Sequence, residues 1–579
     1  MPQKPTNSAI AEVLREIGEY LAMQEIPFKP RAFEKAAEII AGLEEEVADI
    51  YKRGGVKELL TIPGVGASIA EKIEEFIKNG KVKEHEQLKK KTPVDLAGLS
   101  RVEGLGPKSI QRLYKELDIR NLADLEEAAK SGEIAKLAGF GKKSEEKILK
   151  GIGFAKTSGD RSVLGFIMPR VRELEAALRS IQGVEKAIAA GSARRRKETI
   201  GDIDLLVVSK QPEKVMDYFV SMPDVLTVIA NGETKSSVKI RPGVNVDLRV
   251  VPKESFGAAL NYFTGSKDHN VAMRQMAIKK GWKLNEYGLY DVRGGKEKYI
   301  AGASEEDIYK KFGMDYVEPE LRENTGEIEA AMKHALPDII DYKALQGDLQ
   351  VQTNWTDGAD SIENMAKAAM ARGLKYMVVT DHTKRLAMTH GLDEKRIIQQ
   401  WNEIDRVNKK LAGKFKVLTG SECDILKDGT LDLDDKTLSK LDVVGASVHS
   451  FFNLTRAEQT ERVKRAMANP NVDILFHPTG RVINRRAAYD IDMEAIIAWA
   501  KKTKTVLEID AYPDRSDLKD DYIRMCVSAG VKMSIDSDAH ATAHFPFLEY
   551  GIAQARRGWA TKKDIVNAWP AEKMLQFLK

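Results

Sequence analysis

The sequence predicts a multidomain α/β protein with an all-α N-terminal part, an α+β middle part and a C-terminal barrel of seven βα units. Three observations predict this fold class. Helical periodicity broken by glycine hairpins extends to about residue 155, strand-like runs follow at 203–208 and 244–251, and seven short apolar runs alternate with helical patterns beyond about residue 340. A chain of 579 residues is long enough for about four domains.

Composition restricts the class of protein. Hydrophobic residues make up 43% of the chain, enough for several cores, and no apolar run reaches about eighteen residues, so we expect no membrane span. The first ten residues lack an apolar stretch and predict no secretory signal. The two cysteines, Cys423 and Cys526, exclude a disulfide framework and fit a reducing, cytoplasmic compartment. The net charge of +4 is too small to indicate nucleic-acid binding by itself.

The N-terminal part begins with a predicted helix over residues 7–23, where apolar residues recur at helical spacing. Three glycine hairpins follow, with the pairs Gly64 and Gly66, Gly104 and Gly106, and Gly139 and Gly141. Glycine lets a backbone approach phosphate closely, and successive N–H groups form an anion-binding nest. One such pair is usually a plain turn, but three in one small region favour binding to a DNA backbone without reading its sequence.

The two strand-like runs of the middle part carry acidic residues. Asp202 and Asp204 are two positions apart and therefore point to the same face of a strand. In the second run apolar and polar residues alternate, which places Asp247 and Arg249 together on the polar face. Carboxylates this close need a cation, and Mg²⁺ suits a cluster of oxygen ligands. A solvated strand edge would explain Asp247 alone, but the three acids together predict a two-metal site.

The seven apolar runs of the C-terminal part begin near residues 349, 376, 415, 441, 472, 505 and 531. Six of them end in potential metal ligands, which are Asp381 with His382, Glu422, His449, His477, Glu508, and Asp538 with His540. Ligands at the C-terminal ends of parallel strands are what an active site at a barrel mouth requires. A purely structural role would scatter these residues along the chain.

Residues 1 to about 317 resemble the family X nucleotidyltransferases, the DNA polymerase beta family, in the Gly-Ser-x-Arg-Arg and Gly-Asp-x-Asp patterns at residues 191–204. The resemblance implies that Asp202, Asp204 and Asp247 hold Mg²⁺ or Mn²⁺ and perform catalysis. It implies that the triphosphate of a dNTP binds to Arg170, Gly191, Ser192 and Arg195. The match at residues 262–266 implies a nucleotide pocket formed by Tyr262, Phe263, Gly265 and Asn270. Arg249 and Arg274 are assigned to DNA binding, with Arg274 on the template strand.

The first hairpin continues into residues 67–73, which resemble the deoxyribose-phosphate lyase domain of the same family. Lys72 falls on the Schiff-base lysine of that domain, where an unprotonated lysine attacks an open sugar aldehyde. A phosphate-binding or merely solvated lysine explains the position equally well. Ser68 and Phe33 stand where the family has lysine and tyrosine, and both departures remove groups expected to assist a lyase.

Residues 341–579 resemble the polymerase-and-histidinol-phosphatase (PHP) domain of bacterial and archaeal family X enzymes. The resemblance implies 3′–5′ exonuclease and abasic-site endonuclease chemistry. It also implies a site for Mn²⁺, Zn²⁺ or Fe²⁺ with the ligands Asp357, His382, Glu422, His449, His477, Asp538 and His540. The family opens this domain with Asp-Leu-His-x-His-Thr, but here Gln350 and Gln352 replace both histidines. A neutral amide oxygen is a poorer ligand than imidazole, so we expect a weakened metal position and a weak nuclease.

The predicted organisation follows from these resemblances. The segments are a lyase-like helical domain at 1–90, a fingers-like helical domain at 91–155, a nucleotidyltransferase palm at 156–255, a thumb at 256–317, a linker at 318–340 and a distorted (β/α)7 PHP barrel at 341–579. We expect a monomeric, nucleoid-associated, template-directed polymerase that uses dNTPs to fill gaps during base excision repair. The main alternative is a repair nuclease whose N-terminal half delivers DNA, which the intact acidic triad argues against. A non-catalytic scaffold would predict loss of those carboxylates.

Overall fold

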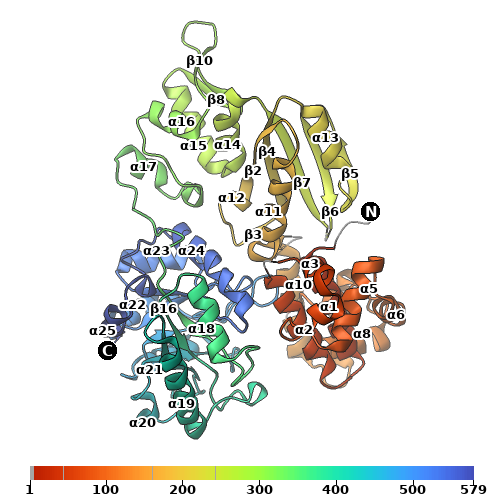
Figure 1. The fold of residues 1–579 in the computed structure, drawn as a ribbon, viewed down its shortest axis with the longest axis vertical. Helices are drawn as coiled ribbons and strands as arrows, with labels where there is room; N and C mark the ends of the chain where they lie inside the picture. Colours follow the sequence, from red (N-terminus) through yellow and green to blue (C-terminus); the bar gives the residue numbers. More distant parts are fainter. Residues whose placement is uncertain (1–4, 44, 103, 159–160, 242, 579) are drawn as a thin grey trace.

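The computed structural model describes residues 5–43, 45–102, 104–158, 161–241 and 243–578. The N-terminal helices and the barrel lie side by side at one end of the molecule, and a mixed sheet with a smaller α/β region forms the other end (Figure 1). The predicted fold class is confirmed. Among the residues described, no helix combines the length and the apolar character needed to cross a membrane.

The N-terminal part is entirely helical and begins with the predicted helix. Its elements are α1 (Asn7–Met23), α2 (Lys29–Gly42), α3 (Val47–Gly54), α4 (Val56–Leu59), α5 (Ala67–Asn79), α6 (Lys83–Lys91), α7 (Leu96–Leu99), α8 (Pro107–Leu117), α9 (Leu122–Lys130), η1 (Ile134–Lys136) and α10 (Lys142–Ser158).

The three hairpins share one backbone geometry. The first glycine of each has a left-handed conformation, with φ of +74° at Gly64, +87° at Gly104 and +80° at Gly139. The second glycine directly precedes the helix α5, α8 or α10. Left-handed backbone favours glycine, so the residue type and the turn agree. Glu103, in the second hairpin, lies outside the described residues.

The middle part is built on a five-stranded sheet in the order β2-β4-β7-β6-β5, in which β4 and β7 are parallel and the other neighbours are antiparallel. Its elements are β1 (Ser162–Val163), α11 (Leu164–Arg179), β2 (Val184–Ala189), α12 (Gly191–Arg194), β3 (Thr199–Ile200), β4 (Asp202–Ser209), α13 (Pro212–Val220), β5 (Val225–Asn231), β6 (Lys235–Ile240), β7 (Val244–Val251) and η2 (Lys253–Ser255).

A second α/β region follows, with a three-stranded antiparallel sheet. It contains α14 (Phe256–Thr264), α15 (Lys267–Lys279), β8 (Trp282–Asn285), β9 (Gly288–Asp291), β10 (Lys298–Ala301) and α16 (Glu305–Phe312). Where the sequence predicts a linker at 318–340, the chain forms η3 (Pro319–Leu321) and α17 (Glu327–Met332). Arg322 in this segment is fully buried and pairs with Glu305 at 2.5 Å. The segment therefore packs into the core of the α/β region.

The C-terminal part is a barrel of seven parallel strands in sequence order, and Val351 bridges to Ala539 next to the closing edge. All seven predicted strands are confirmed. The elements are β11 (Gly347–Val351), α18 (Ile362–Ala371), β12 (Tyr376–Val379), η4 (Ala387–Thr389), α19 (Glu394–Leu411), β13 (Lys416–Asp424), α20 (Asp435–Leu438), β14 (Val443–Ser447), α21 (Arg456–Met467), β15 (Ile474–Leu475), α22 (Met493–Thr503), β16 (Val506–Asp510), α23 (Asp520–Ala529), β17 (Met533–Asp536), η5 (Thr542–Phe547), α24 (Leu548–Arg557), η6 (Val566–Ala568) and α25 (Ala571–Leu578).

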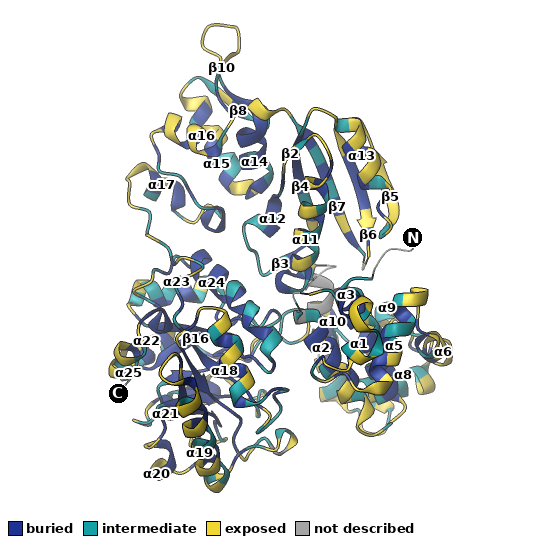
Figure 2. Ribbon diagram, viewed as in Figure 1, coloured by how far each residue is buried: buried dark blue, intermediate teal, exposed yellow. Residues whose placement is uncertain are grey.

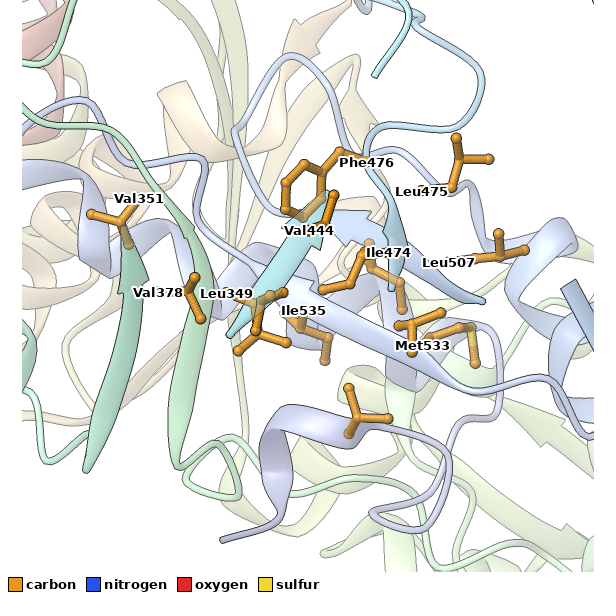
Figure 3. Packing of buried hydrophobic residues seen from close by; sticks show 14 of the residues in the cluster. Leu349, Val351, Val378, Val444, Ile474, Leu475, Phe476, Leu507, Met533 and Ile535 are labelled. Carbon is orange, nitrogen blue, oxygen red and sulfur yellow. The ribbon is translucent and has the colours of Figure 1, made fainter. Parts of the chain in front are cut away.

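Apolar residues on the strands of the barrel form its core. Figure 3 shows Leu349, Ile474 and Ile535 among the side chains packed together there. The strands are buried, whereas the helices around them alternate buried and exposed residues (Figure 2). This is the pattern of a parallel sheet covered by amphipathic helices.

The barrel also packs directly against the other parts. Phe547 and Tyr550 of the barrel belong to the apolar core of the five-stranded sheet. A side chain at Gly165 of α11 would lie 2.7 Å from Pro513 and 3.0 Å from Tyr550, so the two surfaces are in close contact. On the N-terminal side, Lys35 of α2 donates to the backbone oxygen of Asp357 at 3.2 Å.

Candidate functional site

The parallel pair β4 and β7 brings the three predicted acids together. Asp204 lies opposite Asp247 in the strand register, and Asp202 lies opposite Asn245. Burial, then the neighbouring charges of Asp202 and Asp247, raise the pKa of Asp204 to about 7. Three carboxylates gathered on two paired strands fit a divalent cation, which would restore the ionised form of Asp204.

The turn after β2 is shaped by the same cluster. Gly191 begins α12 with φ of +61°, and a Cβ there would overlap Oδ2 of Asp204 and lie 3.2 Å from its Cγ. The backbone N–H of Ala190 donates to the backbone oxygen of Asp204 at 2.8 Å. Both the left-handed backbone and the nearby carboxylate therefore require glycine at position 191.

The predicted triphosphate-binding arginines are both engaged in ion pairs. Arg195, in the turn that contains Ser192, donates from Nε to Glu323 at 3.0 Å and from its guanidinium to the backbone oxygen of Thr264. Arg170, on α11, pairs with Glu173 at 2.7 Å and with Asp224. A triphosphate that contacts either guanidinium would compete with these ion pairs.

The predicted nucleotide pocket lies between α14 and α15. Asn270 donates to the backbone oxygen of Tyr262 at 2.6 Å, and Gly265 has φ of +72° at the bend between the helices. The guanidinium of Arg249 lies 4.5 Å from the centre of the Phe263 ring, which joins this pocket to the polar face of β7. Arg274 is exposed one helical turn after Asn270.

Lys72 lies on α5 with 19% of its side chain exposed, and its Nζ is 3.0 Å from Oε2 of Glu84. Beside the first hairpin is a hollow of about 610 Å³ whose lining includes Phe33, Gly64 and Ser68. The described contacts of Lys72 are thus those of a half-buried ion pair, and they favour neither the lyase nor the phosphate-binding interpretation.

The barrel mouth holds two overlapping groups of metal-ligand atoms, Asp357 with His382 and His540, and His382 with Glu422 and His449. Within each group the ligand atoms lie within 4.8 Å of one another. His477 adds its Nε2 at 2.8 Å from Glu422, and His540 Nδ1 lies 3.8 Å from Asp538. All seven predicted ligands are therefore at the same end of the barrel.

The charges at the mouth favour cation binding. Burial opposes protonation of His449, but Glu422 and Asp424 outweigh it and raise its pKa to about 9. Burial likewise opposes protonation of His540, but Asp538 and Asp357 raise its pKa to about 9. A negative potential that holds protons on these rings also attracts metal cations, so these donors fit Mn²⁺, Zn²⁺ or Fe²⁺.

The two glutamines direct amide groups toward carboxylates at the barrel mouth. Gln352 donates from Nε2 to Glu422 at 2.9 Å, and the amide nitrogen of Gln350, oriented to satisfy its surroundings, lies 3.3 Å from Oε2 of Glu508. At least one oxygen of each carboxylate therefore accepts a hydrogen bond from an amide. Among the described residues, Oε1 of Gln352 has no hydrogen-bond partner, so one neutral oxygen remains for a metal.

The sequence analysis did not single out one acidic residue of the barrel mouth. Asp424, two positions after Glu422 on β13, lies 3.5 Å from Nδ1 of His449, and its spacing from Glu422 could have indicated it. Asp381 is buried and accepts hydrogen bonds from Thr353 and Gln400. Its described contacts are those of a residue that positions the strand ends.

Comparison with known families gives four matches. The chain matches a helix-hairpin-helix domain over residues 5–82 and a SAM-like helix-hairpin-helix tandem over residues 96–153. It matches the DNA polymerase beta thumb over residues 259–323 and the PHP domain over residues 348–506.

Some similar proteins match nearly the whole chain and others match part of it. The DNA polymerase/3′-5′ exonuclease PolX of Bacillus subtilis (strain 168) is 38% identical over 573 residues, which are 98% of this chain and 99% of that protein. DNA polymerase lambda of Rattus norvegicus is 27% identical over 55% of this chain and 57% of its own length, and a probable phosphatase of Thermoanaerobacter sp. (strain X514) is 27% identical over 38% of this chain and 88% of its own. The likeness to PolX extends over 98% of the chain, and the chain also matches both the polymerase beta thumb and the PHP domain, so it belongs to the family X DNA polymerases that carry a C-terminal PHP domain.

Proposed function

We propose that this polymerase fills short gaps in DNA during base excision repair, extending a primer with dNTPs on a template strand. The observation that carries the proposal is the pairing of β4 with β7, which gathers Asp202, Asp204 and Asp247 beside the turn at Gly191. The similarity to PolX and to polymerase lambda supports the reaction class.

In this proposal the three acids hold two Mg²⁺ or Mn²⁺ ions. When bound, such ions activate the primer 3′-hydroxyl and neutralise the leaving pyrophosphate. The chain contributes the orientation of the reactants. Arg195, once released from Glu323, binds the triphosphate, and Asn270 contacts the minor-groove edge of the incoming base.

Primer extension on gapped and ungapped DNA tests the proposal, with shortening scored as well as lengthening. Asp247→Asn should lower nucleotide incorporation by at least about a hundredfold, because one metal ligand is lost, while DNA affinity stays within about twofold. Asp217→Asn, on the exposed face of α13, is the matched control. Near-normal extension by Asp247→Asn would contradict the assignment. Shortening without any extension would instead favour a repair nuclease whose N-terminal half delivers DNA.

We also propose that the barrel is a weak 3′–5′ exonuclease and abasic-site endonuclease. Two observations support this proposal. The seven expected ligands are retained, and Gln350 and Gln352, which stand in place of two expected histidines, form hydrogen bonds to carboxylates. Gln352→His, alone or with Gln350→His, should raise Mn²⁺-dependent primer shortening and leave extension unchanged. Gln346→His, at the opposite end of β11, is the control. Vigorous degradation by the unaltered chain, with no gain from Gln352→His, would show that the glutamines are adequate ligands.

A further inference from the structure

Helix α24 of the barrel lies along the segment that follows the predicted triphosphate turn of the polymerase half. Four consecutive residues of that segment, 195–198, contact the barrel or a residue that the barrel holds. The contacts are the Arg557 guanidinium with the backbone oxygen of Arg195 at 2.9 Å, Arg196 with Glu549 at 3.1 Å, Lys197 with Glu323 at 3.7 Å, and Glu198 with Arg481 at 2.7 Å and with Gln554 at 3.4 Å.

The contacts with the barrel add to two hydrogen bonds within the turn itself, from the N–H of Arg196 to the oxygen of Ala193 at 3.1 Å and from the N–H of Lys197 to the oxygen of Ser192 at 3.0 Å. Arg196 has φ of +54°, a left-handed conformation that costs a non-glycine residue free energy. It persists only where surrounding contacts hold it. The barrel adds two contacts of this kind, the bond from Arg557 to the carbonyl of the peptide that precedes Arg196 and the ion pair of the Arg196 side chain with Glu549.

Glu323 links Arg557 to the side chain of Arg195. The same carboxylate oxygen, Oε1, is 3.0 Å from Nε of Arg195 and 3.1 Å from a guanidinium nitrogen of Arg557. Arg557 is only 3% exposed, and it also donates to Asp520 of α23, so the barrel fixes its position. Because both guanidinium groups contact the same carboxylate oxygen, the attraction between Glu323 and Arg195 is weaker than it would be without Arg557.

We propose that Arg557, a residue of the PHP barrel, is a positioning residue for the polymerase reaction. It fixes the backbone of the triphosphate turn and shares the charge of Glu323, so that the Arg195 guanidinium can leave that carboxylate for the triphosphate of a dNTP. The inference rests on the proposed triphosphate-binding role of Arg195. It gives the barrel a part in DNA synthesis that is independent of its own metal chemistry.

Steady-state filling of a one-nucleotide gap by the full chain, with dNTP concentration varied, tests the proposal. Arg557→Gln should raise the KM for dNTP about tenfold, equivalent to about 1.4 kcal/mol, while kcat and DNA affinity stay within about twofold. Arg557→Lys keeps the charge but not the two-directional donation, so an intermediate KM is expected. The lysine variant also provides a measurement if the glutamine variant does not fold.

Arg556→Gln is the matched control, because Arg556 is the adjacent buried arginine of α24 and bonds to Glu320 and to the backbone of Ile340 instead. Its KM for dNTP should be unchanged. Equal increases in both variants would mean a general loosening of the interface and would overturn the proposal. So would an unchanged KM in Arg557→Gln and Arg557→Lys.

The double variant Arg557→Gln/Glu323→Gln separates charge sharing from a merely structural role. Removing the carboxylate that competes for Arg195 should return the KM toward the value of the unaltered chain, whereas a structural role predicts no rescue. Arg195→Gln tests the premise separately. If it leaves the KM for dNTP unchanged, the triphosphate assignment fails and the proposal with it. If it raises the KM and Arg557→Gln does not, only the proposal fails.

Discussion

Gly191→Ala should lower the rate of nucleotide incorporation much more than it lowers the stability of the central sheet. The added methyl group would meet the carboxylate of Asp204, with its Cγ 3.2 Å away, and the φ of +61° disfavours alanine. The left-handed backbone should lower the free energy of unfolding of the alanine variant by about 1–2 kcal/mol. The effect on the rate should be larger. A shift of about 1 Å in a catalytic carboxylate lowers turnover about a hundredfold, which corresponds to an activation barrier about 2.7 kcal/mol higher.

Gly183→Ala is the matched control at the other end of β2. Gly183 has φ of +93°, but a Cβ there would meet only the Gln211 side chain at 3.5 Å. Both variants should lose similar thermal stability, and only Gly191→Ala should lose gap filling at saturating dNTP and Mg²⁺. If Gly191→Ala extends primers at more than half the normal rate while unfolding like Gly183→Ala, the predicted coupling between the turn and Asp204 is refuted.

Three further predictions concern metal affinity, lyase activity at Lys72 and DNA binding. Because the pKa of Asp204 is raised to about 7, protons compete with the metal below that pH. Mg²⁺ affinity measured by calorimetry should therefore fall by roughly tenfold per pH unit below 7, and a constant affinity from about pH 8 to 6 would contradict this. Borohydride should trap an adduct on an incised abasic site if Lys72 is a lyase nucleophile, and an adduct that persists in Lys72→Ala would remove Lys72 from that role. DNA affinity should fall with salt at a log–log slope of about −0.9 per phosphate contacted, with little dependence on sequence, and a titration that hardly changes with salt would argue against phosphate-binding hairpins.

The sequence was most informative where the signal is local. The starts of the seven barrel strands follow from short apolar runs between helical patterns, and the shared face of Asp202 and Asp204 follows from spacing within one strand. These features depend on neighbours in the chain, so they could be predicted without a structure.

Partners distant in the chain could not be predicted in this way. Arg195 pairs with Glu323 and Arg170 pairs with Asp224, and no local sequence pattern predicts either ion pair. The replacement of histidine by Gln352 is visible in the sequence, but its hydrogen bond to Glu422 depends on how β11 and β13 approach each other across the barrel. The residue types thus indicated the candidate site residues, whereas their hydrogen-bond and ion-pair partners became visible only in the fold.

The completion of the central sheet by Phe547 and Tyr550 has a consequence for biosynthesis. The sheet and α11 leave the ribosome long before these two side chains are made. Until then, the surface around Gly165 that will receive Pro513 and Tyr550 is uncovered apolar area. Exposed area of this kind in a nascent chain invites misassociation and chaperone binding. A chain that ends before the barrel would keep that surface permanently, so the polymerase half reaches its own finished core only when the last part of the protein has been translated.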